Sequence, residues 1–210
     1  EPDGRHDHQG VHHHGDLQLT SGRGLAAGVP SAPAASYDYA VAIDPGVASE
    51  LARARHLALA ADEGAAKELL LSLMPAIEQA DRDDLMLEVL AQLGDIYLVR
   101  TAYDGVTEAV KRIRDCLDTY RGIRAGQRPD LAGEVTFSDA EIDQMLSRYT
   151  RRALFLQIGL AAAHGEHEAA ESGLQDLIDH PSEAVEGAGE HRRLVTHARI
   201  LCAAALCDDD

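Results

Sequence analysis

The stretch that decides the fold is LAQLGDIYLVRTAYDGVTEAVKRI, residues 90–113. Its apolar side chains recur at intervals of three and four residues, which is the period of an α-helix. These positions are Leu90, Leu93, Ile96, Tyr97, Val106, Val110 and Ile113. The pattern predicts one helix capped by Asp83 or Asp84 and a second helix from about Asp104. Because the connection between them is short, we expect the two helices to pack antiparallel.

The order of residues in this stretch resembles the tetratricopeptide repeat. Leu90-x-x-Leu93-Gly94-x-x-Tyr97 corresponds to the large residue, the Leu-Gly pair and the aromatic residue of that repeat, and the apolar residues after Tyr103 correspond to its second helix. Since Gly94 has no Cβ, we expect it to let the second helix approach the first closely. The resemblance implies stacked helical hairpins whose first helices line a concave groove.

Helical spacing continues on both sides of this hairpin. The clearest helix start is at Ser138, which forms a capping box with Glu141 and has Phe137 and Ile142 as a hydrophobic staple. The expected helices run from about Val47 to Asp62, Ala65 to Ile77, Asp83 to Tyr97, Asp104 to Leu117, Ser138 to Ala163, Gly165 to Leu177, and Glu190 to Ala205. We therefore predict an all-α fold of about seven helices, stacked as a tetratricopeptide-like α-solenoid.

Two features indicate a divergent, bacterial member of such a family. A segment rich in Gly and Arg, from about Arg121 to Val135, separates two of the hairpins. The chain also has many Ala, Arg and Asp residues and few Lys, which is typical of a GC-rich genome. Because Asp208 to Asp210 directly follow a helical pattern, we expect residues 47–210 to be a helical repeat domain truncated at its C-terminus.

Composition excludes several classes of partner. The net charge is −17, which repels phosphate backbones and anionic lipid, so we expect no binding to nucleic acid or membrane. No apolar run approaches the roughly 18 residues needed for a membrane span. The three cysteines form no Cys-x-x-Cys pair, which indicates reduced thiols and a cytoplasmic location.

Residues 1–46 contain many Gly and Pro residues without helical spacing, and we interpret them as a flexible tail and linker. Five imidazoles fall within nine positions of this tail, at His6, His8, His12, His13 and His14. Such a tail binds zinc, nickel or copper, because neutral imidazole is a good ligand for these metals. A disordered or expression-derived tail without a physiological metal explains the same residues.

No phosphate-binding loop, nucleophile elbow or other catalytic motif occurs, so we expect a non-catalytic interaction module without a cofactor. The resemblance places the partner-binding groove at Glu88, Gln92, Asp95, Leu98, Val99, Arg152 and Phe155. The acidic and apolar members favour a basic, partly apolar peptide or helix. Packing of Leu98, Val99 and Phe155 against neighbouring helices is an equal alternative. The alternative function is a small-molecule or metal-binding domain of a larger regulator.

Overall fold

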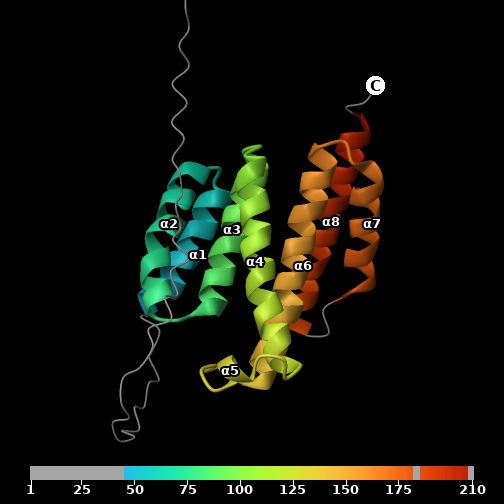
Figure 1. Cartoon of the computed structure of the whole chain (residues 1–210). Coiled ribbons are helices and arrows are strands. Elements are labelled where there is room, and N and C mark those ends of the chain that lie inside the picture. Colours follow the sequence, from blue (N-terminus) through green and yellow to red (C-terminus); the bar gives the residue numbers. More distant parts are fainter. Residues whose placement is uncertain (1–44, 182–184, 208–210) are drawn as a thin grey trace, which may run out of the picture. The chain divides into compact units, whose positions relative to one another are not determined.

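The computed structural model describes residues 45–181 and 185–207, which form eight helices and no β-strand (Figure 1). The helices are α1 (Pro45–Leu59), α2 (Glu63–Gln79), α3 (Asp83–Val99), α4 (Tyr103–Arg124), α5 (Pro129–Ala132), α6 (Asp139–Ala163), α7 (His167–Asp179) and α8 (Val185–Cys207). The all-α prediction is confirmed. The predicted tail, residues 1–46, lies outside the described residues except for its last two positions, where α1 already begins.

The long helices pack antiparallel in the order of the sequence. Within hairpins, α1 packs on α2, α3 on α4, and α6 on α7. Between hairpins, α2 contacts α3, α4 contacts α6, and α7 contacts α8, while α3 also contacts α1 and α6. Among residues 45–181 and 185–207, no helix combines the length and apolar character that a membrane span requires.

The first helices of the three hairpins end in the same kind of turn. Ala61, Thr101 and Gly165 have φ values of 61°, 54° and 71°, in the left-handed region. The following N–H reaches back five residues to close each turn: Asp62 N–H to Leu57 O, Ala102 N–H to Tyr97 O, and Glu166 N–H to Ala161 O, at 2.9, 2.8 and 2.9 Å. This is a Schellman ending, which normally places Gly at the left-handed position. Only one of the three turns here has Gly there.

The core consists of two clusters that share α3. The N-terminal core joins α1 and α2 to one side of α3 through Leu51, Ala54, Ala66, Leu70, Met74, Ile77, Val89, Leu93 and Ile96. The C-terminal core joins the other side of α3, at Leu87, Leu90 and Ala91, to α4, α6, α7 and α8. The three- and four-residue spacing of apolar side chains in α3 thus covers two faces of one helix.

The helix capping at α6 is confirmed. The Ser138 Oγ accepts the Glu141 N–H at 3.4 Å, and the Glu141 carboxylate accepts the Ser138 N–H at 2.8 Å.

The segment predicted as an insertion between hairpins, from about Arg121 to Val135, is partly helical. Helix α4 continues to Arg124, and a short helix, α5, follows at Pro129–Ala132. Pro75 lies inside α2, which ends at Gln79. The last helix begins at Val185, before the expected start at Glu190.

Gly94 has a different neighbour from the one that the repeat pattern implied. A Cβ placed on Gly94 would lie 2.4 Å from Leu156 Cδ1 of α6, so the close approach is between α3 and α6. The glycine between α3 and α4 is Gly105, where a Cβ would lie 2.7 Å from the Tyr97 ring. Gly159 of α6 likewise accommodates Leu98 of α3. The prediction that Gly94 lets the two helices of its own hairpin approach closely was therefore wrong. Gly94 instead allows the close contact between α3 and α6, which belong to different hairpins.

Candidate binding groove

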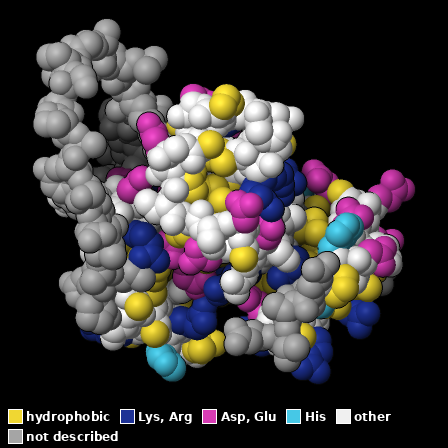
Figure 2. Space-filling view, turned by 90° about the horizontal axis from the view of Figure 1, so that it is seen from below, with side chains coloured by type: hydrophobic (Ala, Val, Ile, Leu, Met, Phe, Trp, Pro, Cys, Tyr) yellow, Lys and Arg dark blue, Asp and Glu magenta, His cyan; other side chains and the backbone are white. Residues whose placement is uncertain are grey.

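A cavity of about 440 Å³ opens between α1, α3, α6 and the segment that leads into α6. Its apolar lining includes Leu51, Leu85, Phe137 and Met145. Its charged lining consists of Arg55, Arg82, Asp84, Glu88, Glu141 and Arg148. Basic and acidic side chains also lie beside one another on the end of the molecule that Figure 2 shows. The cavity therefore offers apolar contact and charge at the same place.

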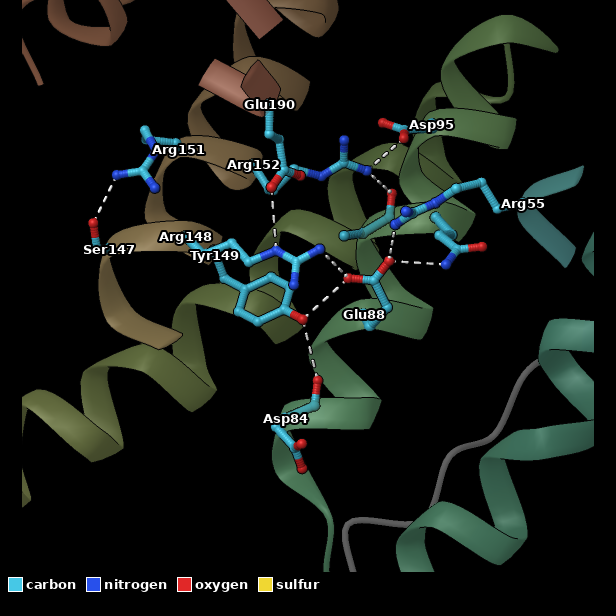
Figure 3. Close-up of polar contacts among 12 residues, drawn as sticks. Arg55, Asp84, Glu88, Asp95, Ser147, Arg148, Tyr149, Arg151, Arg152 and Glu190 are labelled. Atoms are coloured by element: carbon cyan, nitrogen blue, oxygen red, sulfur yellow. Dashed lines mark hydrogen bonds and ion pairs between the residues drawn. The ribbon is translucent and has the colours of Figure 1, made fainter. Parts of the chain in front are cut away.

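Glu88 is at the centre of the charged wall (Figure 3). Its carboxylate accepts hydrogen bonds from Arg55 Nη2 at 2.5 Å, Gln92 Nε2 at 2.9 Å and Arg148 Nη2 at 3.0 Å. The Tyr149 hydroxyl lies 3.1 Å from the same carboxylate. Because Arg55 belongs to α1, Glu88 and Gln92 to α3, and Arg148 and Tyr149 to α6, one carboxylate joins three helices.

The surroundings keep Glu88 ionised. Burial alone raises the pKa of its carboxyl, but Arg148, the hydrogen bond from Gln92 and Arg55 outweigh burial, so the pKa lies below its ordinary value. Burial and the Glu88 charge together raise the pKa of Tyr149. The tyrosine therefore keeps its proton and acts as a hydrogen-bond donor in this wall.

A second ion pair continues the wall along α3 and α6. Arg152 Nη2 donates to Asp95 Oδ2 and lies 3.3 Å from the Ala91 carbonyl oxygen. Burial raises the pKa of Asp95, and the Arg152 charge opposes that effect. Its other oxygen, Oδ1, is buried and accepts no hydrogen bond within the described ranges. The pair is thus shielded from water on one side.

The network reaches α8 through Glu190, whose carboxylate lies 3.3 Å from Arg148 Nε. Arg151, which is only 7% exposed, donates to Ser147 Oγ at 2.6 Å. Burial lowers the pKa of Arg151, and the Glu190 charge works in the opposite direction. Side chains from α1, α3, α6 and α8 therefore form one polar network.

The structure separates the predicted groove residues into three groups. Glu88 and Gln92 line the cavity, and Asp95 and Arg152 pair beyond it. Leu98 packs over Gly159, and Phe155 is 7% exposed within the C-terminal core. The side chain of Val99 is 70% exposed at the end of α3.

The prediction missed Arg55, Arg148 and Tyr149. Arg148 precedes the predicted Arg152 by four residues, so the two share a helix face, and this spacing was a signal that the sequence contained. Arg55 gave no such signal, because it meets Glu88 across 33 positions of the chain. Both predicted acidic residues pair with arginine: Glu88 with Arg55 and Arg148, and Asp95 with Arg152.

The predicted metal ligands, His6, His8, His12, His13 and His14, lie outside the described residues. Within residues 45–181 and 185–207, no three His, Cys, Asp or Glu side chains are grouped so as to hold a metal ion.

Burial, with a smaller contribution from Asp83, raises the pKa of Cys116 to about 12. That thiol is therefore protonated at neutral pH and a poor nucleophile.

Comparisons with protein-family models, curated proteins and solved structures give no significant match. The geometry of the cavity and of its charged wall is therefore the basis for the functional proposal below.

Proposed function

We propose that the hairpins form a divergent tetratricopeptide-like α-solenoid that binds a peptide or helix of a partner protein, without catalysis. The order of helix contacts supports this proposal, because each second helix packs on the first helix of the following hairpin. The Schellman endings of α1, α3 and α6 support it too, because each lets the chain turn back into an antiparallel second helix. In a larger bacterial protein of the cytoplasm, such an array would serve as a regulatory or sensor scaffold.

The observation that carries the proposal is the cavity between the first helices. An apolar wall with Leu51 and Leu85 faces charged side chains such as Arg55 and Arg148. Peptide grooves combine these two properties, because apolar pockets supply affinity and polar groups fix the orientation of the bound segment. The side chain of Arg55 is 49% exposed, and among the described residues it donates one N–H, to Glu88. Its remaining donors are therefore available to a ligand.

The charge states of the wall favour binding over catalysis. A general acid or base works best with a pKa near the working pH. Arginine neighbours hold the pKa of Glu88 below its ordinary range. Burial lowers the pKa of Arg148, but the opposing effect of its acidic neighbours, chiefly the Glu88 charge, outweighs burial, so the pKa is raised. Both groups therefore keep one charge state at neutral pH.

Filling the cavity tests the proposal. Ala52 lines the cavity and is exposed, so Ala52→Trp adds bulk there without disturbing the core. Ala76→Trp, on the exposed side of α2, is the matched control. Peptides would be selected from a random library on the unmodified chain, and their affinities measured by fluorescence anisotropy. We expect at least a tenfold loss of affinity for Ala52→Trp and no loss for Ala76→Trp. Equal binding by both variants would refute the assignment of the groove.

A small-molecule ligand is the second candidate, because the cavity volume of about 440 Å³ falls in the range of small-ligand pockets. Native mass spectrometry of the purified chain distinguishes the two. A bound mass that is present on the unmodified chain and lost on Ala52→Trp would favour the small molecule. An unmodified chain that carries no added mass, yet binds the selected peptides, would favour the peptide.

A further inference from the structure

A second surface with binding character lies on α8, away from the groove. Arg192, Arg193 and Arg199 form no ion pair or hydrogen bond through their side chains with any described residue, and all three are exposed. In the groove, by contrast, Arg55, Arg148 and other arginines are paired with carboxylates. Three exposed arginines without ion pairs make this face of α8 locally basic, although the net charge of the chain is −17.

Large apolar side chains share this face of α8. Ile200 and Leu206 are 60% and 52% exposed. Arg192, Arg199 and Leu206 follow one another at intervals of seven residues, so they form one stripe along the helix, and Arg193 and Ile200 form the adjacent stripe. The opposite face of α8 is buried against the rest of the protein through Leu194, Ala198 and Cys202. The exposed face is therefore both basic and apolar.

The arrangement of the other hairpins indicates the shape of a partner for this face. The first helices α1, α3 and α6 each pack against an antiparallel second helix, namely α2, α4 and α7. Among the described residues, α8 contacts only α6 and α7 and has no such second helix (Figure 1). A helix is thus the element that this architecture places beside a first helix.

The basic charge of the α8 face indicates which side chains the partner helix carries. We propose that the α8 face, defined by Arg192, Arg193, Arg199, Ile200 and Leu206, docks an amphipathic helix of a partner protein. Acidic side chains of the partner pair with the three arginines, and its apolar stripe covers Ile200 and Leu206. A second copy of this chain is disfavoured, because a symmetric contact would place the three arginines of one copy against those of the other. This proposal does not depend on the groove, because the two surfaces share none of these residues.

The probe for the test is a synthetic amphipathic peptide of about 20 residues, long enough to form an isolated helix. Glu would occupy its polar face and Leu its apolar stripe, and a second peptide with Lys in place of Glu would be the control. Binding would be measured by fluorescence anisotropy at low and high salt. We expect the Glu peptide to bind more weakly at high salt. The net charge of −17 attracts the Lys peptide, so any binding of that peptide should not fall when the charge of the α8 face is reversed.

Two variants locate the binding. The double variant Arg192→Glu with Arg199→Glu reverses the charge of the face, and we expect the affinity for the Glu peptide to fall at least about tenfold. Arg100→Glu, at the exposed end of α3, is the matched control and should bind as the unmodified chain does. All of these positions are exposed, and far-UV circular dichroism would confirm that each variant is folded.

Three outcomes would overturn the proposal. One is equal affinity of the Glu peptide for the unmodified chain and for the double variant. Another is an equal loss of affinity for the Glu and Lys peptides in the double variant, which would leave the charge of the arginines without a role. The third is self-association of the unmodified chain in sedimentation that the double variant lacks, since the face would then bind a second copy.

Discussion

Gly94→Ala tests the close contact between α3 and α6. The added Cβ would lie 2.4 Å from Leu156 Cδ1 and 3.1 Å from Cδ2. Leu156 has no exposed surface, so its side chain cannot turn into solvent to make room. Overpacking of this kind costs about 1–3 kcal/mol. Replacing Gly by Ala inside a helix returns about 1 kcal/mol. We therefore expect a net loss of up to about 2 kcal/mol, or up to about 8 °C in Tm for a chain of this size.

Urea unfolding followed by far-UV circular dichroism measures this loss. Gly189→Ala is the matched control, because Gly189 lies in α8 and no atom comes within 4 Å of its added Cβ. That variant should gain about 1 kcal/mol from helix propensity alone. Leu156→Val removes the two δ carbons that the Gly94→Ala Cβ would meet, so the cost of Gly94→Ala should shrink in that background. A Gly94→Ala variant that gains as much stability as Gly189→Ala, or an unchanged cost beside Leu156→Val, would refute the reasoning.

Three further predictions concern the turns, the capping box and the groove. Thr101 has a φ of 54°, so Thr101→Gly should stabilise the protein by about 0.5–1 kcal/mol in urea unfolding; a loss of stability would contradict the strain argument. Ser138→Ala removes the side-chain acceptor at the start of α6 and should cost about 1 kcal/mol, whereas Ser72→Ala, at an exposed serine inside α2, should not. Because the pKa of Glu88 is lowered in the folded state, its ion pairs stabilise the protein above the pKa of an unfolded glutamate, and that stabilisation is lost as the pH falls through the lower folded pKa. Glu88→Gln should therefore be less stable at pH 7, and its difference from the unmodified chain should shrink between about pH 5 and 3; a constant difference would contradict this sign.

The helices could be predicted because their signals are local. The Ser138 and Glu141 capping box is complete within four residues, and the three- and four-residue spacing of apolar side chains marked each long helix. The turns gave weaker signals, because Ala61 and Thr101 adopt the left-handed conformation without being glycine. The short helix α5 has a Pro start but no apolar period, since none of its four residues is buried.

The groove could be predicted only in part, because its contacts are long-range. Glu88 was identified from its position in the repeat pattern, but its pairing with Arg55 and Arg148 joins residues 33 and 60 positions apart. A charge at a groove position therefore does not reveal whether it is free or already neutralised. Phe155 illustrates the same difficulty for an apolar side chain, because its burial depends on helices that only the folded chain brings together.

The sharing of α3 between the two cores has a consequence for cooperativity. Helices α1 and α2 bury their apolar side chains only in the N-terminal core, whereas α3 is also held by the C-terminal core. Opening of the first hairpin therefore leaves the second core intact and costs less than global unfolding. Native-state hydrogen exchange should show the amides of α1 and α2 exchanging through one subglobal opening, ahead of those in α4 and α6. A partner that spans α1, α3 and α6 in the groove would suppress that opening, so binding there is coupled to the order of the first hairpin.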